Sequence, residues 1–466
     1  MARVLLIKPA SRYYYTVSPN LGLGYLAAAL RKAGHDVALL DCDKEKMTPD
    51  GFERYVRGVS YDLAGFQLYT NALASARKQV DAVRRCMKDA VIVIGGPHVS
   101  GDPRQALSYI DAADIAIIGE GERSIVEIAR LTRGLLNGAS MKDIPNIGYR
   151  DAHGAIAINP SSYIEDLDAI PMPAWDLIDP RSYPDAPHGT FARSFPVAPI
   201  VTSRGCPYTC TFCASFTVHG RKMRRRSAGS VIDEIVYLNR DYGVREVHIE
   251  DDNFTMGKAY AKEVLAGIID SGVDIWISLP NGVRIDALDE EMLRLMERAG
   301  VYSFGIGIES GSDRILRKLR KDLTTGDIEE KVKLVKAHSR IRMTGFFLMG
   351  HPEETVEDIE KSIEFALRLR IDRASFSPIM PLPGSAIYEE WKRKIDIGGV
   401  DWHKFLYYQF VPSVSPIGTE VLERLLKKAN MRFYMRPHIM AGLLSEIRTP
   451  YQLKMLCNRA AKIIAG

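Results

Sequence analysis

Long apolar segments and secretion signals are missing from this chain of 466 residues. It contains no run of 18 apolar residues, so we expect no membrane-spanning helix. The apolar run at its start ends in a lysine and a proline and lacks the cleavage site of a signal peptide. A formal net charge of only +4 gives no reason to expect nucleic acid as a partner. These absences predict a cytoplasmic protein in a reducing compartment.

Cysteine is also scarce, but half of it is concentrated in one place. Of six cysteines, three stand at Cys206, Cys210 and Cys213, and the other three are scattered singly. Without a second cysteine pair, neither a structural zinc site nor a disulfide framework is favoured. Thiolates hold iron–sulfur clusters, and three cysteines without a local fourth leave one iron open. The plainer alternative is a zinc knuckle that takes His219 as its fourth ligand.

The first part of the chain alternates apolar strands with amphipathic helices. This order is typical of a parallel α/β sheet with helices on both faces. We therefore expect a doubly wound, Rossmann-like domain over residues 1–138. A proline-rich linker is expected over 139–195, with a few short strands such as Ile147–Tyr149. The expected strands are Val4–Ile7, Val37–Leu40, Leu63–Leu68, Val91–Ile94 and Ile115–Ile118, with helices at Leu21–Ala33, Ala72–Cys86 and Glu122–Leu131.

A second alternating series predicts a partial (βα)6 barrel over residues 196–392, followed by a helical cap over 393–466. The cysteines come directly after its first strand, and parallel barrels carry their chemistry at the carboxyl ends of the strands. The expected strands are Pro199–Ser203, Glu246–Ile249, Ile275–Leu279, Phe304–Ile308, Thr344–Leu348 and Ser375–Ile379.

The segment from Arg204 to Cys213 resembles the C-x3-C-x2-C hallmark of the radical S-adenosylmethionine (SAM) superfamily, including the aromatic residue before the last cysteine. The resemblance implies that Cys206, Cys210 and Cys213 bind a [4Fe–4S] cluster. It also implies that the open iron chelates SAM, which an electron then splits into methionine and a 5′-deoxyadenosyl radical. An external donor such as flavodoxin or ferredoxin would supply that electron.

The first domain resembles the cobalamin-binding domain that many proteins of this superfamily carry. The family spacing runs from Gly24 through 41 residues to Phe66-Gln67-Leu68, and through 26 more to Gly95-Gly96. Leu21 stands where the cobalt-binding histidine would be. The protein ligand to cobalt is therefore missing, while the spacing of the framework remains. By this resemblance Gly95, Gly96, Gly119 and Glu120 face cobalamin; the alternative is that both segments are only tight βα turns.

The resemblance also assigns a SAM site at the strand ends of the barrel. The ammonium of SAM would meet Glu250 and Asp251, and the carboxylate of SAM would meet Arg284. Glu309 and Ser310 would contact its polar parts, and Phe212 would lie beside its adenine. Each residue has a plainer reading, since acidic residues after a strand often cap the next helix. The sequence identifies no catalytic acid or base.

The combined resemblance implies a cobalamin-dependent radical SAM methyltransferase of the class B type, acting on an unactivated carbon of a small molecule or lipid. The alternative is a radical rearrangement, dehydration or carbon–carbon coupling without methyl transfer, in which the first domain does not use cobalamin chemically. A third possibility is a module that only senses SAM or cobalamin.

The last 46 residues carry nine Lys and Arg against two Glu. Basic amphipathic helices can lie on a membrane surface, so peripheral membrane contact is one expectation for this segment. The other expectation is a solvated cap over the barrel.

Overall fold

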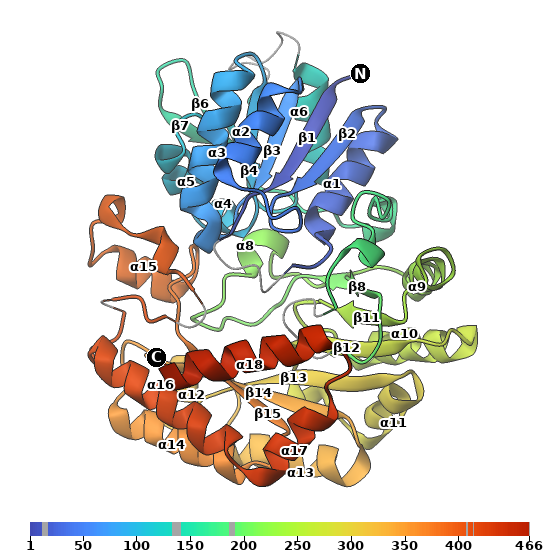
Figure 1. The fold of residues 1–466 in the computed structure, drawn as a ribbon, viewed down its shortest axis with the longest axis vertical. Coiled ribbons are helices and arrows are strands. Elements are labelled where there is room, and N and C mark those ends of the chain that lie inside the picture. The colour runs from blue at the N-terminus through green and yellow to red at the C-terminus, as the bar shows by residue number, and fades with distance from the viewer. Residues whose placement is uncertain (12–16, 133–140, 186–191, 407–408, 413, 466) are drawn as a thin grey trace.

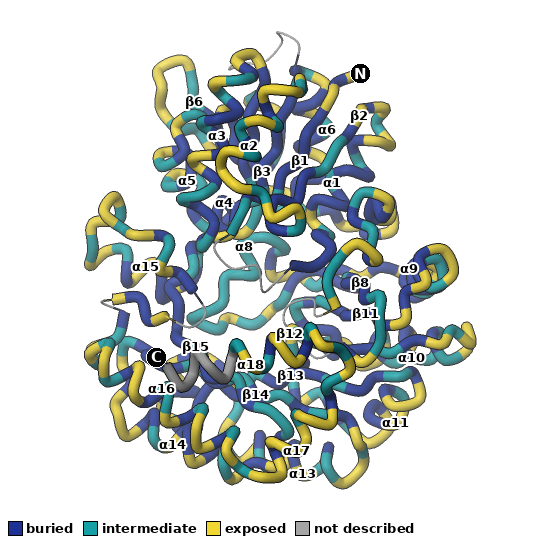
Figure 2. Tube along the Cα trace, in the orientation of Figure 1, coloured by how far each residue is buried: buried dark blue, intermediate teal, exposed yellow. Residues whose placement is uncertain are grey.

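The computed structural model describes residues 1–466 except 12–16, 133–140, 186–191, 407–408, 413 and 466 (Figure 1). Two sheets dominate it, and buried positions follow the strands of both (Figure 2). The first sheet lies at one end of the molecule, and the second is surrounded by helices at the other end.

The first sheet has five parallel strands in the order β2-β1-β3-β4-β5. Apolar residues of α1 and α6 cover one face, and those of α2, α3 and α5 cover the other. The predicted doubly wound fold is therefore confirmed. The elements are β1 (Arg3–Lys8), α1 (Leu21–Lys32), β2 (Asp36–Asp41), α2 (Pro49–Arg57), β3 (Leu63–Gln67), α3 (Leu73–Cys86), β4 (Val91–Gly95), α4 (Pro97–Gly101), α5 (Pro103–Tyr109), β5 (Ile115–Ile117) and α6 (Glu122–Leu131).

The first sheet continues beyond the predicted end of its domain. Two short strands extend it: β6 (Ile147–Arg150) pairs antiparallel with β5, and β7 (Ile156–Ile158) pairs antiparallel with β6. Prolines flank this hairpin at positions 145 and 160, which keeps its strands short. Two of the prolines that suggested a linker therefore enclose an edge hairpin of the sheet, whose first strand, β6, was expected at Ile147–Tyr149.

The second sheet is an open barrel of six parallel strands in chain order, as predicted. Helices after each strand bury their apolar faces against its outer side in one continuous core. The strands are β8 (Val197–Ile200), β11 (Glu246–Ile249), β12 (Trp276–Val283), β13 (Val301–Glu309), β14 (Arg342–Met349) and β15 (Arg373–Pro378). The helices are α9 (Ala228–Tyr242), α10 (Lys258–Ser271), α11 (Glu290–Arg298), α12 (Asp313–Lys318), α13 (Thr325–His338) and α14 (Val356–Arg368).

The C-terminal part of the chain covers both domains. Residues following β15, including α15 (Ala386–Lys392) and the buried Trp402, join the apolar core on the α3 side of the first sheet. The later helices α16 (Thr419–Tyr434), α17 (Pro437–Ser445) and α18 (Pro450–Ala465) lie over the barrel (Figure 1). Within the described part of the chain, no helix has the length and apolar character needed to cross a membrane.

The two domains approach each other at backbone distance where α4 meets the loop after β15. A β-carbon added to Gly101 would lie 2.0 Å from the carbonyl oxygen of Pro383. Next to this contact, Asp102 accepts hydrogen bonds from Tyr388, at 2.9 Å, and from Lys392, both on α15. Glycine is therefore required at position 101 by the docking of the domains.

We expect Gly101→Ala to lower the free energy of unfolding by about 1–3 kcal/mol, the usual cost of overpacking, because backbone atoms cannot move aside locally. Gly229→Ala on α9 is the matched control, since an added β-carbon there meets no heavy atom within 4 Å. The control should change stability by less than about 1 kcal/mol. Urea unfolding of both variants measures this, and equal stabilities would contradict the proposed role of Gly101.

Candidate active site

The cysteines lie in a loop that a short antiparallel hairpin closes. Its strands, β9 (Ser203–Arg204) and β10 (Arg224–Arg225), pair Arg204 with Arg224. The loop between them, residues 205–223, carries the cysteines and the single-turn helix α8 (Phe216–His219). It follows the carboxyl end of β8, as predicted, but the hairpin that closes it was not predicted.

The three cysteines are half-buried and in no disulfide. The backbone N–H of Cys213 donates to the carbonyl of Cys210 at 3.2 Å, which curls the loop. Among the described residues, no three His, Cys, Asp or Glu side chains converge as they would around a single ion. A zinc knuckle requires such convergence, whereas thiolates of a [4Fe–4S] cluster bind different irons. Three free thiols in one loop therefore fit the cluster.

Burial raises the pKa of the Cys206 and Cys210 thiols. The charges of the neighbouring cysteines raise it further in both, while the Lys321 ammonium lowers the pKa of Cys210. Three thiolates gathered in one half-buried loop repel one another, so the loop favours binding of a cationic iron centre.

The acidic turn after β11 holds the start of the cysteine loop. Asp251 is buried and accepts hydrogen bonds of 2.6 Å from the Thr202 N–H and from the Thr202 and Ser203 hydroxyls. Asp252 accepts from the N–H of Gly205, at 3.3 Å. Neither residue caps α10, whose N-cap is Gly257. Glu250 lies half-buried at the same edge. The Asp251 carboxylate, one of the two predicted ammonium partners, thus holds the start of the cysteine loop.

Arg284 lies against the cysteine loop from β12. Its guanidinium carbon is 4.1 Å from the centre of the Tyr208 ring, and it donates to the carbonyl of Lys321 at 2.9 Å. Asp286 accepts from its Nε and from its other terminal nitrogen, at 3.0 and 2.8 Å. Arg284 thus lies beside the cysteine loop, and in this structure its bidentate partner is Asp286.

A buried ion pair beside Cys210 was missed by the sequence analysis. Lys321 donates to Glu309 at 2.8 Å, and both side chains are almost fully buried. Burial would lower the pKa of Lys321, but the Glu309 carboxylate outweighs it and raises that pKa. Glu309 has a φ of +64°, a strained conformation for a residue with a side chain, which is typical of functional sites.

The signal for Lys321 was present but ambiguous, because it stands in the basic run Arg317-Lys318-Leu319-Arg320-Lys321. Only the fold separates it from its neighbours. Arg320 and Asp322 both have positive φ, of 54° and 53°, and both are exposed, whereas Lys321 between them turns inward.

Two predicted SAM contacts, Ser310 and Phe212, also make contacts within the fold. The hydroxyl of Ser310 lies 3.1 Å from that of Ser362 on α14 and accepts from the N–H of Ser312. Phe212 packs against the apolar core that the first domain shares with the segment after β15. Ser310 therefore fastens β13 to α14, and Phe212 helps to join the domains.

The three segments of the cobalamin-type spacing come together at the carboxyl edge of the first sheet. Asn20 donates to Gln67, and a β-carbon on Gly22 would lie 2.7 Å from the Gln67 amide. Gly96 has a φ of +98°, and its β-carbon would lie 3.0 Å from the backbone of Leu68. Leu21, with no ligating atom, stands beside them, so these residues fit a cobalamin held without a protein ligand from that position.

The turn at Gly119 and Glu120 faces the cysteine loop. A β-carbon on Gly119 would lie 3.2 Å from the carbonyl oxygen of Val218 on α8. Glu120 is buried and accepts hydrogen bonds from Arg224 at 2.7 and 2.8 Å. Burial raises the pKa of Glu120, but bonds from His219 and Arg224 and the charge of Arg204 outweigh it, so the net pKa is well below its usual value. The Glu120 carboxylate is therefore engaged by Arg224, and not by the predicted contact with cobalamin.

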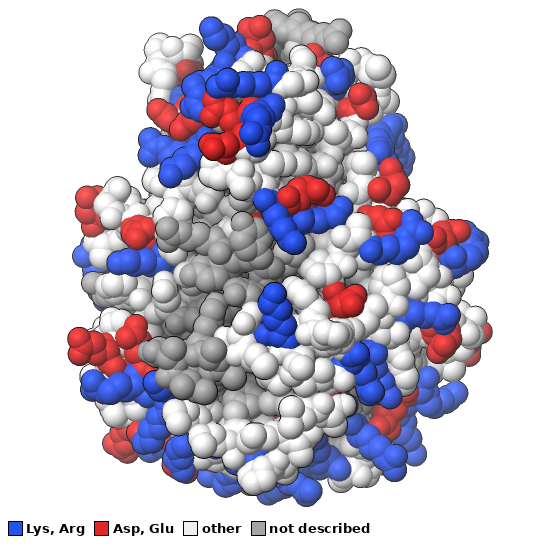
Figure 3. Space-filling model, in the orientation of Figure 1, with Lys and Arg blue, Asp and Glu red and all other residues white. Residues whose placement is uncertain are grey.

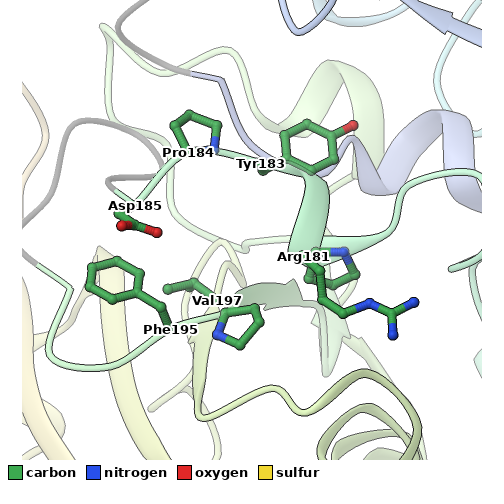
Figure 4. A pocket seen from close by; sticks show the side chains of 8 residues that line it. Arg181, Tyr183, Pro184, Asp185, Phe195 and Val197 are labelled. Carbon is green, nitrogen blue, oxygen red and sulfur yellow. The ribbon is translucent and has the colours of Figure 1, made fainter. Parts of the chain in front are cut away.

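A pocket of about 160 Å³ lies between the segment after β7 and the first residue of β8, Val197 (Figure 4). Tyr183, Pro184 and Asp185 line one side, and Phe195 lines the other. It opens at the amino end of β8, away from the cysteines, and holds no ion-binding cluster among its described residues. The sequence also has three consecutive aromatic residues, Tyr13, Tyr14 and Tyr15, which could stack on a flat ligand or pack on the linker; they lie outside the described residues.

Comparison with protein families identifies both domains. The radical SAM superfamily matches residues 200–366, and the B12 binding domain matches residues 8–129. The chain is 30% identical over 443 residues to an uncharacterized methyltransferase of Pyrococcus horikoshii, and 94% of each chain is covered. It is 31% identical over 458 residues to the cytidylyl-2-hydroxyethylphosphonate methyltransferase of Streptomyces wedmorensis, covering 87% of this chain and 84% of that protein.

Two solved structures share the fold. The apo form of OxsB, a cobalamin-dependent SAM radical enzyme, superposes with a TM-score of 0.74 at 17% identity, covering 99% of this chain and 71% of that one. The radical SAM methyltransferase TsrM from Kitasatospora setae, with tryptophan and a SAM analogue bound, gives a TM-score of 0.67 at 21% identity, covering 83% and 75%.

We expect Cys210→Ala to lower the iron content of anaerobically reconstituted protein from about four per chain and to abolish 5′-deoxyadenosine formation, because the cluster loses a ligand. Cys457→Ala is the control, since Cys457 is exposed on α18. Iron analysis and chromatography of SAM products measure both effects. Full activity in the Cys210 variant would rule out the cluster assignment.

Proposed function

This chain belongs to the cobalamin-binding branch of the radical SAM superfamily, and we propose that it methylates an unactivated carbon of a small molecule. Its family membership confirms the predicted cofactors, which are a [4Fe–4S] cluster, SAM and cobalamin. The observation that carries the proposal is the meeting of both cofactor regions at one place. The cysteine loop of the barrel and the carboxyl edge of the cobalamin-type domain are in direct contact.

Cys206, Cys210 and Cys213 would hold the cluster. For SAM, the residues around the loop offer charges of both signs: Glu250 toward the ammonium, and Lys321 with Arg284 toward the carboxylate. Lys321 is favoured because it keeps its charge while buried beside Cys210. Cobalamin would lie along Gln67, Gly95 and Gly96.

When bound, these cofactors supply both the radical and the methyl group, so the protein has to place them and exclude competing reactions. Each turnover breaks one substrate C–H bond and forms one C–CH3 bond. It consumes two SAM molecules and two electrons from an external one-electron donor. The products are the methylated substrate, methionine, S-adenosylhomocysteine and 5′-deoxyadenosine, the last of which carries the hydrogen taken from the substrate.

Methyl transfer is favoured because the two relatives described above, at 30% and 31% identity, are both named methyltransferases. A second candidate comes from relatives at 24–28% identity that are named anaerobic magnesium-protoporphyrin IX monomethyl ester cyclases. Such a reaction would use the radical without delivering a methyl group, which is the alternative that the sequence left open.

The ratio of the two SAM products separates these candidates. Protein reconstituted with cluster and cobalamin, given a one-electron reductant and SAM carrying a deuterated methyl group, should form S-adenosylhomocysteine as well as 5′-deoxyadenosine. With cytidylyl-2-hydroxyethylphosphonate as a trial substrate, a deuterated methyl group in the product would also identify the substrate class. Formation of 5′-deoxyadenosine without any S-adenosylhomocysteine would overturn the methyltransferase proposal in favour of the second candidate.

The same proposal places the enzyme in the cytoplasm, with flavodoxin or ferredoxin as electron donor. Its surface also offers one candidate for peripheral membrane contact. The basic residues Lys428 and Arg432 of α16 are paired with Glu360 and Glu364 of α14, so two of the nine basic residues of this segment fasten a cap to the barrel. Exposed apolar side chains lie beside it at Met435, at Met440 and at Leu444, which is 58% exposed. Lys and Arg side chains line this lower end of the molecule (Figure 3).

If this surface meets lipid, the double variant Met440→Gln, Leu444→Gln should sediment less with vesicles of phosphatidylglycerol and phosphatidylcholine, because it loses the apolar contact. Ile158→Gln, at an exposed apolar position on β7, is the control. Equal sedimentation of all three proteins, or none for the unaltered protein, would leave the C-terminal helices as a structural cap only.

A further inference from the structure

Two glutamates of the first domain hold the cysteine loop at both of its ends. Arg204 and Arg224 face each other in the hairpin that closes the loop. Glu120 receives both terminal nitrogens of Arg224, at 2.7 and 2.8 Å, and lies 3.3 Å from Arg204. Glu122 accepts from Arg204 at 2.6 Å. We call these four residues the interdomain ion cluster.

The interdomain ion cluster is shielded from solvent. The side chains of Glu120 and Arg224 are 1% and 2% exposed, and those of Arg204 and Glu122 are 6% and 9% exposed. Breaking a buried pair leaves an uncompensated charge, so these contacts resist separation far more than surface pairs do. The planar guanidinium also fixes the orientation of its partner through paired bonds. The contacts therefore set an angle as well as a distance.

Further bonds make the arrangement rigid. Arg224 donates at 2.7 Å to the carbonyl of Ile164 and, at the same distance, to the carbonyl of His219 at the end of α8. The second oxygen of the Glu120 carboxylate also accepts from the N–H of Ile164, at 2.9 Å. The same few side chains thus hold the turn after β5, the segment around Ile164 and both arms of the hairpin.

The position of this cluster relates it to both cofactor regions. Arg204 precedes Cys206 by two residues, so the guanidinium is close in sequence to the first predicted iron ligand. Glu120 and Glu122 follow β5, whose carboxyl end lies on the same sheet edge as Gln67 and Gly96. A rigid connection between the two regions therefore runs through these four side chains.

We infer that Glu120 and Glu122 are positioning residues that fix the separation and orientation of the cysteine-bound cluster, with its SAM, relative to cobalamin. Transfer between two bound groups depends steeply on their placement, and an error near 1 Å can cost roughly 100-fold in rate. The activity readout of this inference rests on the proposed function, whereas its spectroscopic readout does not.

The test uses the full chain loaded with cluster and cobalamin, in Glu122→Gln, in Glu120→Gln and in the control Glu127→Gln. Each change keeps the shape of the side chain and removes its charge. Glu127 stands on α6 like Glu122 but makes an exposed pair with Arg130. Glu122 bonds Arg204 through one oxygen only, and its other oxygen accepts no hydrogen bond from the described residues, so its variant is the milder one.

The first readout is the dipolar coupling between the reduced cluster and cobalamin in its Co(II) state, both of which are paramagnetic, measured by pulsed electron paramagnetic resonance. We expect one narrow distance distribution in the unaltered protein and in the control. In Glu120→Gln and Glu122→Gln we expect a broadened or displaced distribution at unchanged iron and cobalamin content. If Glu122→Gln gives the same distance distribution as the unaltered protein, the inference is overturned. Should Glu120→Gln fail to fold, the result for Glu122→Gln alone is decisive.

The second readout compares the two SAM products. In Glu120→Gln and Glu122→Gln we expect S-adenosylhomocysteine formation to fall roughly 10- to 100-fold. Formation of 5′-deoxyadenosine by uncoupled cleavage should stay within about twofold of that in the unaltered protein. Loss of both products by the same factor would indicate a merely structural role and overturn the inference. If the unaltered protein forms no S-adenosylhomocysteine, the proposed function fails, and the distance measurement still decides the role of the glutamates.

Discussion

The buried bonds between Glu120, Glu122, Arg204 and Arg224 are the contacts on which the arrangement of this protein depends. They connect the turn after β5 to both arms of the hairpin that carries the cysteines. Charged groups are costly to bury, and here the cost is offset only when both domains contribute their partners. The first domain and the cysteine loop consequently adopt one relative position, which the apolar core shared with the segment after β15 reinforces.

Around the cysteine loop, supporting residues come from several strands of the barrel. Asp252 after β11 binds the N–H of Gly205, and Arg284 after β12 lies over Tyr208. After β13, the carbonyl of Leu319 accepts the N–H of Thr211 at 3.1 Å, and Lys321 lies beside Cys210. These contacts hold a loop in shape, and none of them arranges an acid or a base. That agrees with a reaction whose chemistry belongs to cofactors, for which the protein supplies placement.

Much of the fold could be read from periodicity. The five strands of the first sheet and the six of the barrel were predicted close to their observed limits, because parallel strands buried on both faces give continuous apolar runs. The strand β6 was expected inside the linker at Ile147–Tyr149, but its partner β7 and the short helices α2, α4 and α5 were missed. Few apolar residues mark α2, and β7 is only three residues long. In the site, the cysteines were found because their spacing is itself the signal. Asp251 and Ser310 were assigned to SAM from position alone, and their hydrogen bonds instead fasten elements of the barrel.

The sequence by itself determined the chemistry of this protein. Ligand type and spacing are local properties, so three cysteines within eight residues identify the cluster, and the interval between Gly24 and Gly96 identifies the cobalamin framework. Only the tertiary structure decided which charged residues serve these groups. Glu120 lies 104 positions from Arg224, and Lys321 stands among other basic residues that point to solvent. The stabilisation of a buried charge depends on partners that folding brings from distant segments, and no local pattern in the sequence records that pairing.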